Sequence, residues 1–489
     1  MPGGSKEYDE IPCSNDEEMK PSKSSYNEKS SLLDKSAKTS ITTRKWTQYL
    51  AALIVTIGGF IMGTTLGWTS PAGPMMKNNQ YKFHVAEENV SWIASFMALG
   101  AMIGCPVMAV LVHKLGNIKL MIILTVPTLL GWTMIIWAKS VTWIYVGRIL
   151  TGFASGSYSV IVPQYTSEIA EKEIRGTLGT YFQLQVFSGI LFTYFMGSYL
   201  NVFGLSFACA IVPIIYINLL FFLPESPMFH LIKGDVNKAV LSLNFFYGSH
   251  GQVDHELYIL QKSLTKTKNE RLTILQAFQT TAAKRGLFLG IGIMIFQQFT
   301  GANAVIFYTT TIFDATGSTI SSNTSTIIVG VMAVLSTYFS TLVIDRLGRK
   351  ILLLYSVVAM GITTFLIGGF FYAKDTFYDV SSIGYVPLVS LCVFIVMFSI
   401  GFGPIPWMMM GEIFPTQIKG IASSIVCMSN WFFVFLVTKF YSSLVSAIFI
   451  YNTFWLFTLF CVVGTFFVIY FVPETKGKTI DEIQELLSA

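Results

Sequence analysis

The sequence predicts an all-α membrane protein, and three features of the chain lead to that prediction. Its 489 residues are 53% hydrophobic and 12% charged, whereas soluble domains have about 25% charged residues. Apolar stretches of about 20 residues, the length that crosses a bilayer as a helix, recur from residue 47 to residue 472. Short charged motifs occur once in each half of the chain. A water-soluble fold is excluded, because it would expose too much apolar surface.

Residues 1–45 are polar, with many Ser, Lys and Glu residues and no apolar periodicity. They predict a disordered tail without a cleavable signal peptide. Within the tail, Glu28, Leu32 and Leu33 fit the acidic dileucine pattern that sorting adaptors bind, which would add an endosomal pool to a protein of the cell membrane. A chance match is the alternative for so short a pattern.

Twelve transmembrane helices are predicted after the tail. We place them near residues 47–67, 91–112, 119–137, 142–165, 177–200, 206–223, 286–312, 324–344, 351–373, 385–410, 420–442 and 450–472. The predicted domains are a six-helix bundle at 46–223, a cytoplasmic helical insert at 224–285, a second six-helix bundle at 286–472 and a tail at 473–489. In the insert, we expect Asp235 to cap one helix, and Thr273 with Gln276 to form the capping box of another.

Basic residues predict that both termini and the insert are cytoplasmic, because cytoplasmic loops carry an excess of Lys and Arg. The even-numbered loops, the insert and the tails hold most of them. The odd-numbered loops hold only Lys77, Lys82, Lys139 and Lys374. The glycosylation sequons at Asn89 and Asn323 then lie on the outer side, each close to a predicted helix.

Three motif pairs indicate two homologous halves. Glu168-x6-Arg175 recurs as Glu412-x6-Lys419, 412 − 168 = 244 residues later. Pro224-Glu225 recurs as Pro473-Glu474 (473 − 224 = 249), and His113–Gly116 recurs as Asp345–Gly348 (345 − 113 = 232). Two parallel six-helix halves with a binding site between them near the bilayer midplane describe the major facilitator fold.

The candidate binding residues lie in the seventh predicted helix. Gln297, Gln298, Asn303 and Tyr308 occur there without any charged neighbour in the stretch 295–311. Amides and phenols both donate and accept hydrogen bonds, which suits a neutral ligand rich in hydroxyl groups. Thr300-Gly301 interrupts the helix, and interrupted helices hold the substrate sites of many transporters. The alternative is that these amides only join helices inside the bundle.

With these motifs the chain resembles the sugar porter family of the major facilitator superfamily. Within that family it is most similar to insect facilitated trehalose transporters and class III facilitative glucose transporters. The residues that carry the resemblance are Gly147-Arg148, Pro163-x-Tyr165-x-x-Glu168-x6-Arg175-Gly176, Pro224–Pro227, Gln297-Gln298-x-x-Gly301-x-Asn303, Asp345-Arg346-x-Gly348-Arg349-Lys350, Gly403–Trp407, Met408–Pro415, Asn430-Trp431, Val437–Lys439 and Pro473–Thr479.

The resemblance implies a sugar site that is shared by helices five, seven, ten and eleven. Its residues would be Gln183, Gln297, Gln298, Asn303, Trp407, Asn430 and Trp431. The residue chemistry agrees, since indole faces pack on the C–H face of a pyranose ring. Gly403-Pro404-Ile405-Pro406 prevents a regular helix, and it serves either as a bend during transport or as a static kink.

A group of charged residues at the cytoplasmic helix ends is predicted to act as a gate. Opposite charges from the two halves would meet when the inner side closes. These residues are Glu168, Arg175, Glu225, Asp345, Arg346, Arg349, Glu412, Lys419 and Glu474. The alternative is that they only set membrane topology. In the first half, His113–Ile118 lacks the basic residues that usually follow this loop's Gly, so we expect its part of the gate to be weaker.

The predicted function is facilitated transport of a neutral sugar such as glucose or trehalose. Proton-coupled members of the family carry an Asp in the first helix, whereas Leu66–Thr69 is uncharged here. A proton-coupled symporter and a transporter-like sugar sensor are the alternatives. No catalytic constellation, metal-ligand cluster or phosphate-binding loop stands out, so we expect no enzyme activity, no cofactor, no metal and no nucleic-acid partner. The expected partners are the sugar and the lipid bilayer.

Overall fold

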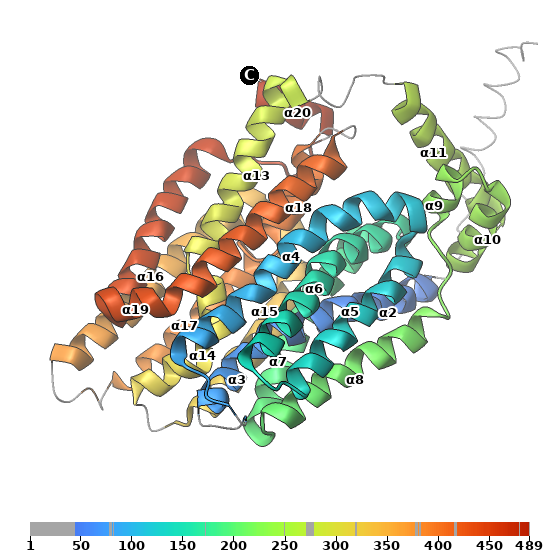
Figure 1. Cartoon of the computed structure of the whole chain (residues 1–489). Helices are drawn as coiled ribbons and strands as arrows, with labels where there is room; N and C mark the ends of the chain where they lie inside the picture. The colour runs from blue at the N-terminus through green and yellow to red at the C-terminus, as the bar shows by residue number, and fades with distance from the viewer. Residues whose placement is uncertain are drawn as a thin grey trace, which may run out of the picture.

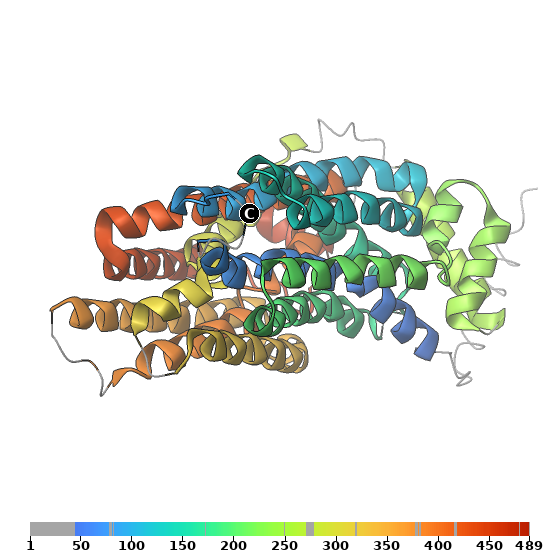
Figure 2. The same cartoon turned by 60° about the horizontal axis from the view of Figure 1, so that its bottom comes forward.

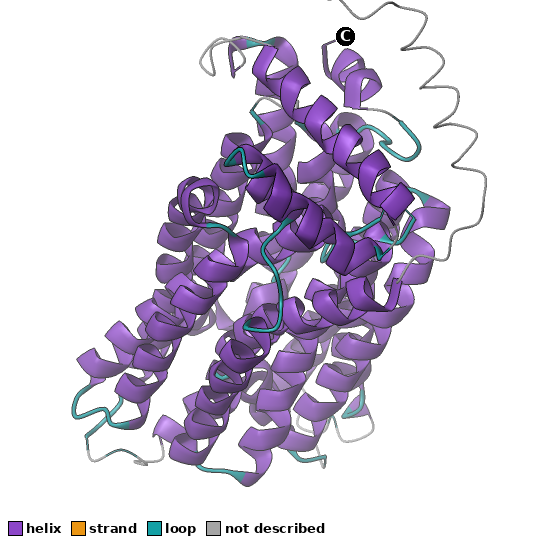
Figure 3. Cartoon of the chain, turned by 90° about the vertical axis from the view of Figure 1, so that its right-hand side faces the viewer, coloured by secondary structure: helices purple, strands orange, loops and turns teal. Residues whose placement is uncertain are grey.

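The computed structural model describes residues 45–77, 81, 83–171, 173–248, 250–269, 278–317, 320–376, 380, 383–414, 418–478 and 480–488. Helices form all the regular structure of this part of the chain, without a strand (Figure 3). The sorting pattern at Glu28, Leu32 and Leu33 lies outside the described residues, as does the capping box of Thr273 and Gln276.

The first half of the chain, as the name is used below, comprises helices α2 to α8. They are α2 (Lys45–Gly67), α3 (Thr69–Lys77), α4 (Glu87–Leu115), α5 (Asn117–Ile136), α6 (Val141–Ile169), α7 (Arg175–Tyr199) and α8 (Val202–Leu220). The insert forms α9 (Pro227–Ile232), α10 (Val236–Tyr247) and α11 (His250–Asn269). As predicted, Asp235 caps α10, its side chain accepting a hydrogen bond from the backbone N–H of Lys238.

The second half comprises α13 to α19. They are α13 (Thr281–Phe299), α14 (Ala302–Thr316), α15 (Ser322–Leu347), α16 (Arg349–Thr376), α17 (Val386–Ile400), α18 (Ile405–Ile413) and α19 (Lys419–Phe471), and α20 (Ile480–Ser488) follows. The predicted interruption at Thr300-Gly301 separates α13 from α14. The second interruption lies at Gly401–Pro404, slightly before the predicted one, because Pro406 fits into the first turn of α18.

Length and apolar composition identify nine helical stretches of the described residues that are able to cross a membrane. Helices α6 and α7 are not among the nine. Helix α19 counts as one stretch of 53 residues, although Phe449, with a φ of 66°, divides it in two. The fold is an all-α membrane fold, and its count of twelve crossings stays a prediction.

The helices run between two ends of the molecule (Figures 1 and 2). The insert end carries α9, α10 and α11, and the opposite or far end carries the contact between α3 and α14. Both described chain ends lie at the insert end, where Thr47 bonds to the Phe246 carbonyl and Gln484 bonds to the Ile413 carbonyl. Helix α4 packs along α19, and α7 packs along α15, so these two helix pairs join the halves.

Candidate functional site

Four of the predicted amides form one hydrogen-bonded cluster, which we call the amide ring. Gln297 and Gln298 end α13, Asn303 begins α14, and Asn430 comes from α19. Gln298 Nε2 donates to Asn430 Oδ1 at 2.7 Å, Asn430 Nδ2 donates to Gln297 Oε1 at 2.9 Å, and Asn303 Nδ2 donates to Gln298 Oε1 at 2.5 Å. The two glutamines are 3% exposed and Asn430 is 2% exposed. Buried amides require such partners, since an unpaired one is costly.

The break between α13 and α14 brings these amides together. Gly301 has a φ of +93°, and a Cβ there would lie 2.6 Å from the Phe457 ring, so only glycine fits. Thr300 Oγ1 closes the end of α13 by donating to the Gln297 carbonyl at 3.2 Å. The turn places the first residues of α14 beside the last residues of α13. As a result, Asn303 bonds to Gln298 across the turn.

The second helix break also contributes to the ring, which the sequence did not indicate. Gln297 Nε2 donates to the carbonyl of Phe402 at 2.6 Å and to that of Gly403 at 3.1 Å. These carbonyls lack helical partners because Gly401–Pro404 interrupts the hydrogen-bonding pattern between α17 and α18. The amide ring therefore connects both interrupted helices to α19.

Three other predicted ligands lie outside the ring. The Trp431 indole is 3% exposed, and its Nε1 finds no hydrogen-bond partner among the described residues. Trp407, in α18, is half-buried against a hydrophobic core to which both halves contribute. Gln183, in α7, is half-buried, and none of the described hydrogen bonds joins it to an amide of the ring.

Tyr308 lies away from the amide ring, toward the far end. Its hydroxyl donates to the Thr438 carbonyl at 2.8 Å, and its ring lies 4.8 Å from that of Tyr441. Tyr308 also lines a cavity of about 120 Å³ together with Thr69 and Ser91 of the first half. The structure thus assigns Tyr308 to a surface between the halves rather than to the amide ring.

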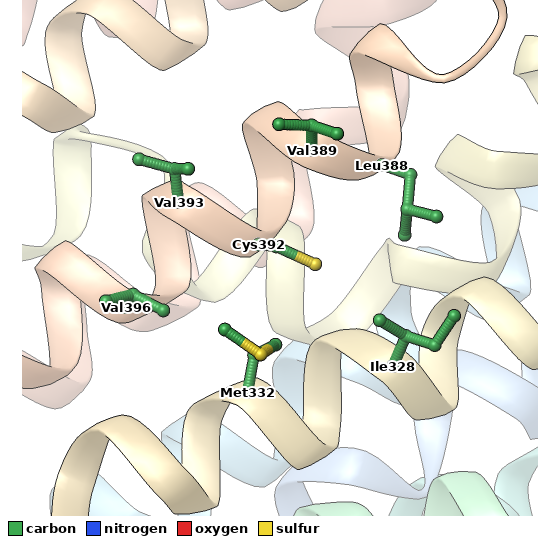
Figure 4. Close-up of a pocket in the computed structure, with 7 residues that line it drawn as sticks. All are labelled: Ile328, Met332, Leu388, Val389, Cys392, Val393 and Val396. Atoms are coloured by element: carbon green, nitrogen blue, oxygen red, sulfur yellow. The ribbon is translucent and has the colours of Figure 1, made fainter. Parts of the chain in front are cut away.

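A larger cavity of about 430 Å³ lies between α15 and α17 (Figure 4). Met332 and Cys392 point toward each other across it. Its other lining residues are Ile328, Leu388, Val389, Val393 and Val396. Apolar side chains offer a sugar no hydrogen bonds, so this cavity is not a sugar site.

Arg148 of α6 is fully buried, and its guanidinium bonds to residues of α2, α3 and α4. Its guanidinium donates to the Thr65 carbonyl at 2.8 Å, to the Ile93 carbonyl at 3.0 Å and to Thr69 Oγ1 at 3.0 Å. The guanidinium carbon lies 5.3 Å from the centre of the Trp68 ring. Neutral oxygen atoms and an aromatic face therefore satisfy this cation, and no carboxylate takes part in the described contacts.

Two predicted gate residues perform the same task in the two halves. The Glu225 carboxylate accepts the backbone N–H groups of Asn117 and Ile118 at 2.9 and 3.0 Å, at the start of α5. The Glu474 carboxylate accepts those of Arg349 and Lys350 at 3.0 and 3.1 Å, at the start of α16. Anions at helix N-termini are favourable, because unpaired N–H groups and the positive end of the helix dipole face them.

The two carboxyl groups differ in their pKa values. Burial raises the pKa of Glu225 above its ordinary value, although backbone N–H groups partly oppose this shift. Burial also acts to raise the pKa of Glu474, but the backbone N–H groups of Lys476, Arg349 and Lys350 outweigh it, and the pKa is lowered. The ionised carboxylate is therefore better stabilised in the second half.

The remaining gate residues also bond within their own halves. Arg349 pairs with Glu412 at 3.1 Å, and Thr475 Oγ1 donates to Glu412 at 2.6 Å. Arg175 donates to the Ala170 carbonyl, and Lys419 is half-buried near Glu412. Asp345 and Arg346 belong to α15, but their side chains are outside the described part of the structure. The predicted pairing of charges between the halves stays a prediction.

In the first half, Asn117 takes the position that Arg349 has in the second. It donates to Glu168 Oε2 at 3.3 Å, and Gln164 donates to Glu168 Oε1 at 2.9 Å. Neutral donors thus replace the ion pair, and a weaker gate in the first half stays a prediction.

Hydrogen bonds between the halves lie mainly toward the far end. Ser70 Oγ and Thr310 Oγ1 are 3.0 Å apart, and the Tyr194 hydroxyl donates to the Ile306 carbonyl at 2.7 Å. Lys439 Nζ donates to Ser91 Oγ at 3.1 Å. Nearer the insert end, the sulfur atoms of Cys105 and Cys427 approach to 3.1 Å.

The two sequons differ in accessibility. Asn89 is half-buried near the start of α4, where its Nδ2 donates to the Tyr145 hydroxyl at 2.9 Å and its Oδ1 accepts from the Ala86 N–H. Asn323 is exposed in the first turn of α15. Glycosylation of either residue stays a prediction.

Comparison with known proteins identifies the family. The chain is 39% identical over 454 residues to the facilitated trehalose transporter Tret1 of Bombyx mori, covering 92% of this chain and 89% of the relative. It is 40% identical over 441 residues to Tret1 of Aedes aegypti, but spans only 55% of that longer protein.

Solved structures share the fold. The proton:xylose symporter XylE bound to 6-bromo-6-deoxy-D-glucose has a TM-score of 0.75 at 24% identity, over 90% of this chain and 99% of that one. The inward open conformation of XylE from E. coli has a TM-score of 0.74 at 22% identity, with the same coverage. These similarities establish the major facilitator fold alone.

The family model for sugar (and other) transporters matches residues 51–487. Because this match covers most of the chain, the resemblance that the motifs indicated is confirmed. The protein is a multi-pass membrane protein that belongs to the sugar (and other) transporter family.

Proposed function

We propose that the protein is a facilitative carrier of a neutral sugar, with trehalose as the first candidate and glucose as the second. The amide ring is the observation on which the proposal depends, because it concentrates uncharged donors and acceptors at two interrupted helices. The names of the Tret1 relatives supply the sugar class.

In this proposal the sugar binds by replacing hydrogen bonds of the amide ring. A sugar hydroxyl both donates and accepts, so it replaces an amide–amide hydrogen bond without leaving either amide unpaired. Asn303 is the half-buried member of the ring, and the sugar would enter between it and Gln298. Trp431, with its unpaired Nε1, would add a donor, while Gln183 and Trp407 would approach from α7 and α18.

The proposed orientation places the insert end in the cytoplasm, because Lys and Arg gather there. The far end, with its bonds between the halves, is then closed on the outer side. The gate charges at the insert end bond within their own halves, as expected for a carrier whose inner side is not latched. Sorting through Glu28, Leu32 and Leu33 remains part of the proposal.

Purified protein in proteoliposomes tests the proposal. We expect labelled trehalose or glucose to equilibrate across the membrane, with the transported sugar identified by competition between the two. If the protein binds a sugar but transports neither trehalose nor glucose, the result would instead support the sensor alternative.

A further inference from the structure

Lys439 is a buried cation that the proposed sugar site does not use. It lies within an apolar stretch of α19 and is 8% exposed. Removing an ammonium group from water is costly unless polar or aromatic groups replace the water. None of the ion pairs in the described part of the chain involves Lys439, so its stabilisation must come from other contacts.

Both described contacts of the Lys439 ammonium are made with the other half of the molecule. Nζ donates to Ser91 Oγ at 3.1 Å, and it lies 4.0 Å from the centre of the Trp92 ring. Ser91 donates its own hydroxyl proton to the Glu88 carbonyl at 2.8 Å, which leaves its lone pairs facing the ammonium. A cation over an indole ring is the strongest pairing of this kind.

The surroundings hold both partners in place. The Trp92 ring stacks on Phe96 at 5.1 Å and lies 6.5 Å from Phe435, one turn before Lys439. On the other side, the Tyr308 hydroxyl bonds to the carbonyl of Thr438, which ties this part of α19 to α14. Ser91 and Tyr308 also line the cavity of about 120 Å³ at the far end.

The contact crosses from α4 to α19, so it exists only while the halves are close at the far end. We infer that Lys439, Ser91 and Trp92 form a far-end latch, in which Lys439 acts as a positioning residue that sets the balance between outward-open and outward-closed carrier. The expected changes in sugar KM rest on the proposed function. The expected change in conformation, measured without sugar, does not.

The expected consequence is a change in the apparent affinity on each face. A ligand that binds only one state has an apparent Kd equal to its intrinsic Kd divided by the fraction of protein in that state, so the apparent Kd rises as that fraction falls. Lys439→Met should populate the outward-open state, lowering the KM for outer sugar and raising it for inner sugar. Loss of a cation–π contact corresponds to a change of about 2- to 30-fold.

The decisive experiment measures conformation without sugar. Ser442, half-buried in the far-end cavity, is changed to Cys, and its reaction with a membrane-impermeant maleimide is followed in oriented proteoliposomes. Protein with Ser442 intact gives the background from native cysteines. We expect Lys439→Met and Trp92→Leu each to accelerate labelling, the double variant to add little, and Lys439→Arg to stay near the wild-type rate.

Lys139→Met is the matched control, because Lys139 lies 6.0 Å over Trp143 within the first half. Unchanged labelling in folded Lys439→Met and Trp92→Leu would overturn the latch. Accelerated labelling in a carrier that moves neither sugar would support the latch and refute the proposed function instead. A change in labelling equal to that of Lys139→Met would also count against the latch.

Discussion

At the scale of single residues, replacing one amide of the ring leaves the amide to which it was bonded without that partner. Gln298 bonds to both Asn303 and Asn430, so it holds the centre of the cluster. A hydrogen bond between neutral groups contributes about 0.5–1.5 kcal/mol, and a buried orphaned group costs about 1–3 kcal/mol. Substitutions here therefore affect the site through the remaining amides as well as through the sugar.

Gln298→Ala is expected to lower sugar flux at least about tenfold, since one lost bond and one orphaned amide together exceed about 1.4 kcal/mol. Flux and sugar affinity are measured in proteoliposomes. Asn218→Ala is the control, because that amide is exposed on α8 and its one hydrogen bond among the described residues goes to its own helix, at the Ile214 carbonyl. Wild-type affinity and flux in Gln297→Ala, Gln298→Ala and Asn303→Ala together would rule out the ring as the site.

Residue types and local interruptions were readable in the sequence, whereas contacts between distant segments were not. Three amides in one uncharged stretch and the Gly301 break predicted the cluster. Its bonds to the Phe402 and Gly403 carbonyls depend on how α17 and α18 diverge, which no local pattern encodes. Tyr308 was grouped with the amides by its position in the sequence, but the kink at its own φ of −122° directs it to Thr438 instead.

At the scale of helices, the repeated carboxylates are the clearest internal comparison. Glu225 and Glu474 each bind two N–H groups at a helix start, but they lie beside Asn117 in the first half and Arg349 in the second. The sequence predicted this repeat from the paired motifs. It did not show that each carboxylate caps a helix of its own half.

The pH dependence of stability should differ between the two caps. The folded pKa of Glu474 is lowered, so its contribution is present above the unfolded pKa and is lost as the pH falls through the folded value. The folded pKa of Glu225 is raised, so stability decreases as the pH rises through the window between the unfolded and folded values. We expect Glu474→Gln to lower the Tm in detergent at pH 7.5 more than Glu225→Gln. The gap should close as the pH drops below about 4, and equal losses at pH 7.5 would contradict this account.

Helices α4 and α19 also bring two thiols together across the halves. Oxidation of Cys105 and Cys427 by copper phenanthroline should form a disulfide, with loss of two protons and two electrons to the oxidant. A protease site is introduced between α11 and α13. After cleavage, the two halves run separately on a gel unless the disulfide joins them. We expect linked halves and lost transport, both reversed by dithiothreitol, and neither change in Cys427→Ser. Separate halves after oxidation of the native protein would show that these helices do not meet at this depth.

At the scale of the whole molecule, the fold was predictable because membrane composition and internal repeats restrict the choices severely. The number of membrane crossings was harder to predict from the sequence. Length and apolar composition do not identify α6 and α7 as crossings, and α19 joins two predicted helices, 420–442 and 450–472, across the break at Phe449. The conformational state was not predictable at all, since the same charged motifs are compatible with an open and with a closed insert end.

The last prediction concerns the driving force, and it follows from where the charges lie in the whole molecule. A coupled proton must reside on a group whose pKa the conformational change can move. Arg148 bonds to Thr69 and to two carbonyls, and arginine keeps its proton. Glu168 and Glu412 lie in the last turns of α6 and α18, close to the insert end. With equal sugar on both sides and an imposed pH gradient, we therefore expect no accumulation in proteoliposomes. Concentrative uptake that a protonophore abolishes would overturn this expectation and direct attention to Glu168, which accepts hydrogen bonds from the neutral side chains of Asn117 and Gln164.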